Sequence, residues 1–233
     1  GGFWRGGPIS PDFRHIDVLP RITENAVGFI RDHAKKTTEK PFFLYFPLSA
    51  PHTPWLPTAE FEGKSEAGPY GDFAAQVDWS VGQVLKELDD CKLTDDTLIV
   101  FLNDNGGTQG KAHSNGSLRG FKGTYWEGGI RVPYIVSWPA QLPKGLQYDQ
   151  PISSLDLLPT CLAAAGGEGD PAWEMDGVNL LPYLSGENET VPHENLFWRF
   201  WRVSVARQGP WKLLRVAENP LEEDRELLAP LML

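Results

Sequence analysis

Residues 97–133, TLIVFLNDNGGTQGKAHSNGSLRGFKGTYWEGGIRVP, decide the fold and the candidate site of this 233-residue chain. The apolar run 98–102 ends just before Asp104 and Asn105, and a loop rich in Gly, Ser and Asn follows it. The run has the length and composition of a buried strand, which places the polar residues in the loop at its carboxyl end. Lys122 lies farther along the same stretch, flanked by a Gly-Phe pair and a Gly. In open α/β sheets, loops at the carboxyl ends of strands are where ligands bind.

The polar residues of this stretch suit a metal and an anion. The carboxylate of Asp104 and the amide oxygen of Asn105 are the kind of ligands that Ca²⁺ prefers. The ammonium group of Lys122 can bind an anionic oxygen and offset charge on a leaving group. Each residue also has an ordinary interpretation, since Asp-Asn-Gly suits a plain turn and most lysines are solvated. Together the three predict a divalent cation that holds an anionic, oxygen-rich substrate.

The order of elements upstream predicts an α/β fold. Apolar residues at helical spacing indicate helices over residues 22–36 and 72–88. Residues 42–46, FFLYF, and residues 97–102 have strand length and composition, and residues 132–138 indicate a third strand. A strand, a helix and a strand in this order are typical of a βαβ unit, so we expect a mostly parallel sheet flanked by helices.

The character of the chain changes after Gly166. A helix is expected over residues 154–165, and the Trp-rich segment 198–205 then leads through Gln-Gly-Pro to WKLL at 211–214. This pattern predicts an antiparallel hairpin within a small C-terminal antiparallel sheet. The expected domains are therefore residues 1–166 and 167–233. The tail, residues 222–233, is charged and then apolar, and no role is assigned to it.

Composition bounds the function. The chain has 21 basic and 31 acidic residues, a formal net charge of −10, which disfavours nonspecific binding to nucleic acid. No apolar run approaches the roughly 20 residues that a membrane-spanning helix needs. The two cysteines, Cys91 and Cys161, cannot form a disulfide framework, and each is interpreted as a small, partly buried side chain.

Three ordered motifs carry a resemblance to a known family. They are Asp-Asn-Gly at 104–106, G-x-K-G-T-x-W-E-G-G-x-R-V-P around Lys122, and Ala-Pro-His-Thr-Pro around His52. The chain resembles the calcium-dependent, formylglycine-type sulfatases of the alkaline-phosphatase-like superfamily. The resemblance implies that Asp104 and Asn105 are Ca²⁺ ligands, that Lys122 binds sulfate, and that His52 assists departure of the alcohol. It also implies the α/β fold that the element order predicts.

The same resemblance identifies what has no counterpart in this chain. The family's nucleophile is a formylglycine formed from the cysteine of a C-x-P-x-R motif, and neither Cys91 nor Cys161 lies in such a motif. The family's N-terminal pair of aspartates has no match either. We therefore expect a C-terminal fragment of a sulfatase that is inactive alone. Its expected partner is the missing N-terminal part of the same enzyme, which would supply formylglycine.

The predicted function has alternatives. The expected substrate is a sulfated small molecule or a sulfated carbohydrate, with no nucleic acid and no membrane span. A phosphoesterase or phosphonate hydrolase of the same superfamily would hold zinc or manganese, but Asn105 stands where related zinc enzymes commonly have a histidine, which favours Ca²⁺. A nonenzymatic remnant or binding subunit is the third possibility, because the nucleophile motif has no match. The sequence does not assign a compartment, although the resemblance favours a periplasmic, secreted or lysosomal protein.

The other candidate residues receive simpler interpretations. His113 lies in the loop between the two motifs of the opening stretch and is expected at most to line an entrance. The remaining histidines, His15, His33 and His193, belong to no motif and are expected to be structural or exposed. Residues 126–129, Trp-Glu-Gly-Gly, are expected to support the loop, with the tryptophan packed beneath it and the glycines allowing a tight turn.

Overall fold

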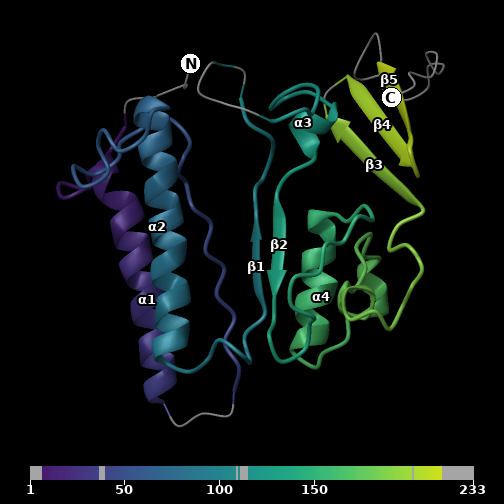
Figure 1. The fold of residues 1–233 in the computed structure, drawn as a ribbon, viewed down its shortest axis with the longest axis horizontal. Helices are drawn as coiled ribbons and strands as arrows, with labels where there is room; N and C mark the ends of the chain where they lie inside the picture. The colour runs from purple at the N-terminus through teal and green to yellow at the C-terminus, as the bar shows by residue number, and fades with distance from the viewer. Residues whose placement is uncertain (1–6, 37–39, 109, 111–114, 201, 217–233) are drawn as a thin grey trace. The chain divides into compact units, whose positions relative to one another are not determined.

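The structure is a computed structural model that describes residues 7–36, 40–108, 110, 115–200 and 202–216 (Figure 1). His113 and the tail 222–233 lie outside the described residues. The contacts divide the chain into two compact units, residues 1–140 and residues 141–233, and each is described below by itself. The domain boundary expected at 166/167 stays a prediction.

Two long helices lie side by side in the first unit. A 3₁₀ turn, His15–Asp17, leads into α1, Val18–Lys35, and α2 spans Gly68–Asp90. These elements confirm the two helices that the apolar periodicity predicts. Their shared face is apolar and almost fully buried, as the exposed fractions of its side chains show: Leu19 2%, Ala26 4%, Ile30 0%, Phe73 8% and Leu88 3%.

Polar contacts fix the pairing of α1 and α2. The hydroxyl of Thr23 donates to Leu19 O at 2.7 Å and to Ser80 Oγ at 3.0 Å, inside the helix interface. The guanidinium of Arg31 donates two hydrogen bonds to the carboxylate of Glu87, at 2.9 and 2.7 Å. This bidentate ion pair lowers the pKa of Glu87 from its ordinary value.

A two-stranded antiparallel sheet follows in the same unit. Strand β1, Ile99–Leu102, pairs with β2, Tyr134–Ser137, so that Ile99 lies opposite Ser137 and Leu102 opposite Tyr134. The short helix α3, Glu127–Ile130, precedes β2. Both strands were predicted from the sequence. Their antiparallel register shows that the chain reverses between them, which brings the start of β2 to the carboxyl end of β1.

The parallel pairing expected from the sequence is not found among the described strands. Residues 42–46 are extended and alternate in burial, but they join no ladder, and both described sheets are antiparallel. The parallel βαβ pairing of these residues with residues 97–102 is therefore not formed among the described strands. A parallel ladder requires a neighbouring strand at hydrogen-bonding distance, and sequence order alone does not supply one.

The second unit contains short helices and a three-stranded sheet. It comprises the 3₁₀ turn Ser154–Asp156, α4 at Leu157–Ala164, a second turn at Pro171–Trp173, and α5 at Leu181–Leu184. Strands β3 (Asn195–Phe200), β4 (Val203–Gln208) and β5 (Trp211–Val216) form an antiparallel meander. The meander confirms the predicted small C-terminal antiparallel sheet.

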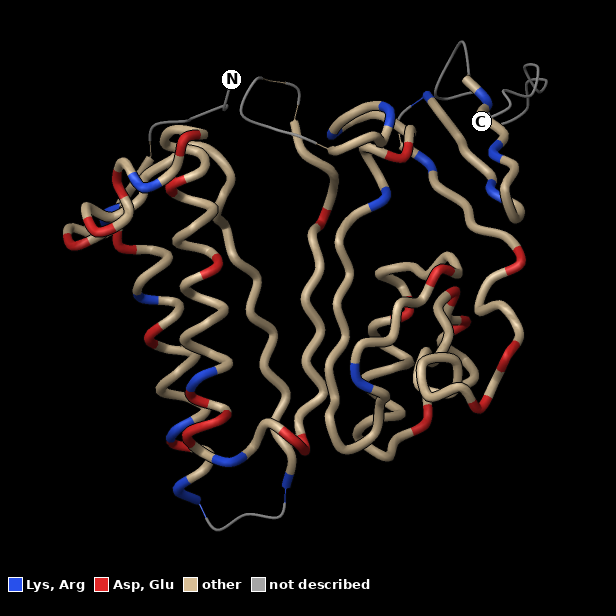
Figure 2. The backbone as a smooth tube through the Cα atoms, in the orientation of Figure 1, with Lys and Arg blue, Asp and Glu red and all other residues tan. Residues whose placement is uncertain are grey.

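Charge is unevenly distributed along the first unit. Figure 2 shows acidic and basic residues on α1, on α2 and in the loop that leads into α2. The extended segment that follows α1 and strand β1 carry almost none. Residues 41–59 contain no Lys, Arg, Asp or Glu at all. Within the described residues, no helix combines the length and apolar character required to cross a membrane.

Candidate active site

The loop that leaves β1 carries the two predicted metal ligands. The carboxylate of Asp104 is exposed, and the half-buried Asn105 donates from Nδ2 to Gly106 O at 3.0 Å, which leaves its amide oxygen available. The backbone N–H of Gly106 donates to Gly129 O at 3.0 Å. A Cβ atom at Gly106 would lie 1.8 Å from Gly128 O, so only glycine fits here. The close approach of two backbone segments therefore fixes the direction in which the ligand loop leaves the strand.

A second contact joins this loop to the predicted sulfate-binding lysine. The backbone N–H of Lys122 donates to Gly107 O at 2.8 Å. Lys122 is half-buried, and its side chain forms no ion pair with any of the described residues. The structure thus brings together the backbone of Lys122 and the Asp104–Asn105 loop, which lie some fifteen positions apart in the sequence.

Asn115 ties the same two segments together through its side chain. Its Oδ1 accepts from Gly107 N at 2.8 Å, and its Nδ2 donates to Gly120 O at 3.0 Å. The half-buried Asn115 amide forms one hydrogen bond to each loop and so fixes the distance between the two loops. Sequence analysis did not single out Asn115, because an asparagine in a Ser-Asn-Gly turn has an ordinary local explanation.

The lysine loop is closed by glycines. Gly120 has φ of +88°, and a Cβ there would lie 2.5 Å from Thr124 Oγ1. The N–H of Gly128 donates to Arg119 O at 2.7 Å, and Gly128 and Gly129 are buried. A Cβ at Gly128 would lie 2.3 Å from Gly120 O. The glycines are therefore required by close backbone approach, in agreement with the supporting role expected for residues 126–129.

Arg119 is a cationic residue of this loop that sequence analysis did not identify. Its guanidinium lies 3.7 Å from the ring centroid of the half-buried Trp126, over the aromatic face. This cation–π contact holds an exposed positive charge in place three residues before Lys122. The loop therefore presents two cationic side chains, in keeping with an anionic ligand.

His52 lies at the end of the extended segment that contains residues 42–46. Its ring Nδ1 is 2.9 Å from Thr53 O, so a protonated Nδ1 donates to this carbonyl and Nε2 is not used in that contact. The residue is exposed. In the described part of the chain, no hydrogen bond or ion pair joins its side chain to Asp104, Asn105 or Lys122. The structure thus links three of the four predicted site residues through their loops, and leaves His52 outside that network.

The ligands present suit a hard cation but form only part of a site. Asp104 and Asn105 offer a carboxylate and an amide oxygen, which fit Ca²⁺, and Ca²⁺ usually takes six to eight oxygens. Among the described residues, no group of three or more His, Cys, Asp or Glu side chains is positioned to hold a metal. Further oxygens would have to come from elsewhere.

Neither thiol has the properties of a nucleophile. Burial raises the pKa of Cys161 above its ordinary value. Burial and a hydrogen bond to the Glu87 carboxylate, 3.6 Å away, raise the pKa of Cys91. Both groups therefore stay in the protonated thiol form at neutral pH, which is the unreactive form.

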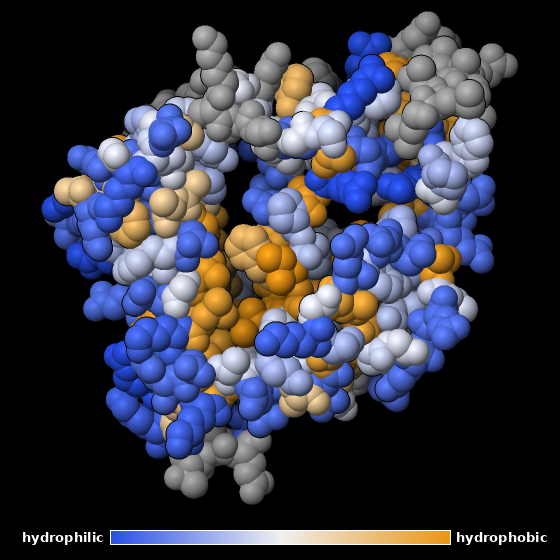
Figure 3. Space-filling model, viewed as in Figure 1, coloured by the Kyte–Doolittle hydropathy of each residue, from blue (hydrophilic) through white to orange (hydrophobic). Residues whose placement is uncertain are grey.

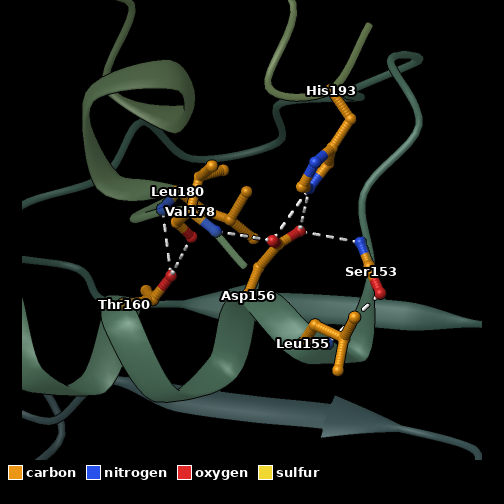
Figure 4. A network of polar contacts seen from close by, with 7 residues as sticks. All are labelled: Ser153, Leu155, Asp156, Thr160, Val178, Leu180 and His193. Carbon is orange, nitrogen blue, oxygen red and sulfur yellow. Dashed lines mark hydrogen bonds and ion pairs between the residues drawn. The ribbon is translucent and has the colours of Figure 1, made fainter. Parts of the chain in front are cut away.

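A separate buried network in the second unit is structural (Figure 4). Asp156, fully buried, accepts from Ser153 N at 2.7 Å, from Val178 N at 2.9 Å and from the ring of His193 at 2.8 Å. A fully bonded carboxylate of this kind holds three segments together and leaves no atom for a substrate. His193 is thus structural, as expected, but its partner lies 37 positions away and has no signal in the sequence.

The loops that carry Asp104, Asn105 and Lys122 meet at the carboxyl end of β1. The sulfatase family model matches residues 20–167, and the chain belongs to that family. It is similar to human steryl-sulfatase, with 40% identity over 197 residues that cover 81% of this chain and 33% of that protein. Bovine arylsulfatase A shows 37% identity over 216 residues, covering 88% and 42% of the two chains.

Comparison of structures gives the same fold. The crystal structure of the PsFucS1 sulfatase from Pseudoalteromonas sp. superposes with a TM-score of 0.78 and 23% identity, covering 96% of this chain and 47% of that chain. The likeness shows the sulfatase fold. The chain therefore spans between a third and a half of the length of these related proteins.

Proposed function

We propose that this chain supplies the sulfate-binding portion of a sulfatase that hydrolyses a sulfate ester. The observation that carries the proposal is the hydrogen bond from Lys122 N to Gly107 O, reinforced by Asn115, which holds the lysine loop against the Asp104–Asn105 loop. A lysine and a cation held by Asp104 and Asn105 would contact the same sulfate group from two sides.

Each residue has a defined part in this proposal. Asp104 and Asn105 would hold Ca²⁺, whose positive charge would offset that of the sulfate oxygens. Lys122 binds a sulfate oxygen and stabilises the charge that develops as the bond to the alcohol breaks. In the imidazolium form, His52 would donate from Nδ1 to Thr53 O and give its Nε2 proton to the departing alcohol oxygen. Arg119 adds positive potential that attracts anionic substrates to the loop.

The nucleophile lies outside this chain in our proposal. Cys91 and Cys161 lie outside any C-x-P-x-R motif, so they do not fit the role of a formylglycine precursor. The complementary part of the sulfatase domain would supply formylglycine together with the remaining Ca²⁺ ligands. The substrate is a sulfated small molecule or a sulfated carbohydrate, since the relatives include a steryl-sulfatase and an arylsulfatase.

A chimera tests the proposal directly. This chain would replace the matched 42% of bovine arylsulfatase A in one polypeptide, and turnover of 4-nitrophenyl sulfate would be measured with Lys122→Ala and with Lys144→Ala. Lys144 is an exposed lysine outside the loop and serves as the matched control. Loss of a charge aimed at the transferred group is worth about 3 kcal/mol, so Lys122→Ala should lower kcat/KM on the order of a hundredfold at an unchanged melting temperature.

The other outcomes would reject the proposal. An active chimera that keeps its kcat/KM in Lys122→Ala would remove Lys122 from the site. Equal losses of stability and turnover would make Lys122 a structural residue. A folded chimera that cleaves 4-nitrophenyl phosphate and not the sulfate would favour the phosphoesterase alternative.

A further inference from the structure

The guanidinium of Arg119 is fixed in place, yet it has no acceptor among the described residues. Its Cζ lies 3.7 Å from the ring centroid of Trp126, and no hydrogen bond or ion pair joins its side chain to another residue in the described ranges. Arg31, by contrast, donates two hydrogen bonds to the carboxylate of Glu87. A guanidinium stacked on an aromatic face keeps the N–H donors in its own plane free. Arg119 is therefore an oriented set of donors that can take an external oxyanion.

The backbone around Arg119 is fixed as well. The carbonyl oxygen of Arg119 accepts from the N–H of Gly128 at 2.7 Å. The next residue, Gly120, has φ of +88°, and a Cβ atom there would lie 2.7 Å from Cβ of Trp126. This close passage of the backbone beside the tryptophan places the Arg119 side chain on its ring. A side chain that is ordered before a ligand arrives loses less conformational entropy when it binds.

Lys122 leaves the same loop a short distance away. Its side chain also forms no hydrogen bond or ion pair with the described residues, while its N–H donates to Gly107 O at 2.8 Å. The turn around it is closed by Thr124, whose hydroxyl donates to Phe121 O at 2.7 Å and accepts from Phe121 N at 3.1 Å. Three residues of chain span at most about 11 Å, so the Cα atoms of Arg119 and Lys122 lie within that distance.

The loop is locally positive in an acidic chain. Residues 115–126 contain Arg119 and Lys122 and no Asp or Glu, although the net charge of the whole chain is −10. Figure 1 shows the loop beside α3, and Figure 3 shows hydrophilic and hydrophobic atoms next to one another at the surface there. A positive field beside an aromatic side chain suits a ligand that carries anionic groups on a ring.

We propose that Arg119 is a specificity-determining residue that binds a second anionic group of the substrate. This group is a carboxylate or a further sulfate, and it lies on the same ring as the sulfate held by Lys122. The inference rests on the proposed function, in which Lys122 binds the sulfate that is removed. It narrows the substrate class from sulfate esters in general to esters with two oxyanions on one ring. The planar fork of a guanidinium matches such oxyanions with two parallel hydrogen bonds.

Two other roles for Arg119 have different consequences. A residue that only supports Trp126 would change the melting temperature and leave every preference among ligands unchanged. A residue that only adds positive potential would be replaced by any cation at the same position, because long-range attraction depends on charge and not on the shape of the donor. The variants below separate these roles from direct contact.

The first experiment measures binding by this chain alone and needs no turnover. Titrations followed by NMR would give the Kd of benzenesulfonate, of benzene-1,3-disulfonate and of 3-sulfobenzoate, which are stable probes with one or two anionic groups. We expect both two-anion probes to bind about tenfold more tightly than benzenesulfonate, the factor that a charge-assisted hydrogen bond supplies. The tighter of the two identifies the second group as a sulfate or as a carboxylate.

Three variants assign this preference to its source. Arg119→Met should bring the Kd of all three probes together with the melting temperature little changed, because the guanidinium bonds to no described residue. Arg119→Lys keeps the charge without the planar fork and should lose most of the preference. Arg21→Met, at an exposed arginine of α1, is the matched control for one lost positive charge and should keep the preference.

The arylsulfatase chimera adds a kinetic test. The ratio of kcat/KM for phenyl 1,3-disulfate to that for phenyl sulfate should fall about tenfold in Arg119→Met and stay the same in Arg21→Met. Binding preference in the chain without any turnover by the chimera would sink the proposed function and keep the oxyanion contact. Turnover by the chimera without the binding preference would do the reverse.

Several results would overturn the inference. Equal Kd values for probes with one and with two anionic groups would do so, as would a preference that survives in Arg119→Met. A preference fully kept in Arg119→Lys would show that only the charge acts. An Arg119→Met chain that no longer folds would make Arg119 a structural residue.

Discussion

The loops around Lys122 and the segment 42–46 lie in the same unit and differ in how completely their backbones are bonded. In the loops, the N–H groups of Gly106, Gly107, Lys122 and Gly128 all have acceptors. In the segment, no backbone group is bonded in the described structure. The difference teaches that the loops of the candidate site are held by contacts within this chain, whereas residues 42–46 are bonded to none of the described strands.

The largest expected effect concerns turnover by this chain alone. The chain alone should not turn over 4-nitrophenyl sulfate, because loss of a catalytic nucleophile typically costs on the order of a millionfold in rate. Calorimetry should also show no tight Ca²⁺ site, since Asp104 and Asn105 supply too few of the six to eight oxygens. Calcium-stimulated turnover by the purified chain would contradict both statements.

Gly106→Ala tests the loops around Lys122, whose backbone groups are bonded within the chain. Its Cβ would lie 1.8 Å from Gly128 O, so the two loops must separate, and we expect a loss of about 3 kcal/mol in the free energy of unfolding. Gly82→Ala is the control, because a Cβ in that part of α2 meets nothing within 4 Å and should stabilise the helix by about 0.5–1 kcal/mol. Urea denaturation measures both. A Gly106→Ala protein as stable as the parent would show that the loops are not tightly joined.

Asn115→Ala sharpens the comparison by removing one link between the loops. The N–H of Gly107 loses its acceptor, which should cost about 1–3 kcal/mol in the free energy of unfolding and speed its exchange with solvent. Asn103→Ala, at an exposed residue before Asp104, should change neither quantity. Hydrogen exchange at Gly107 provides the measurement, and identical exchange in the two variants would remove Asn115 from its positioning role.

Arg31→Gln is expected to have the smallest effect and depends on pH. The pKa of Glu87 is lowered chiefly by its hydrogen bonds to Arg31, so the pair stabilises the fold fully above the ordinary carboxyl pKa. That stabilisation is lost as pH falls through the lowered pKa of the folded state. The parent should thus unfold at a higher temperature than Arg31→Gln at pH 7, and the gap should close in acid. Lys35→Gln, at an exposed pair with Asp32, is the control.

Local pattern predicted the elements and the C-terminal hairpin, but not the pairing of residues 42–46. The apolar stripes of α1 and α2, the run before Asp104 and the Gly209 turn between β4 and β5 each carry their signal within a few residues. The pairing of residues 42–46 has no such local signal, because a strand-like segment forms a ladder only when a partner strand lies beside it. For that reason the parallel pairing expected there is not formed among the described strands.

The candidate site shows the same limit. Asp104, Asn105, His52 and Lys122 were identified from motif and residue type, and their roles stay proposals. Asn115 and the Asp156–His193 pair act through contacts made only by folding, across gaps in the sequence that no periodicity marks.

Hydrogen exchange on the chain alone tests the central contrast most directly. The amides of Gly106, Gly107, Lys122 and Gly128 should be protected, because each is bonded within the chain. The amides of residues 42–46 should exchange at close to unprotected rates, because none of them is bonded in the described structure. Protection of residues 42–46 in the isolated chain, or fast exchange at the loop amides, would contradict the account.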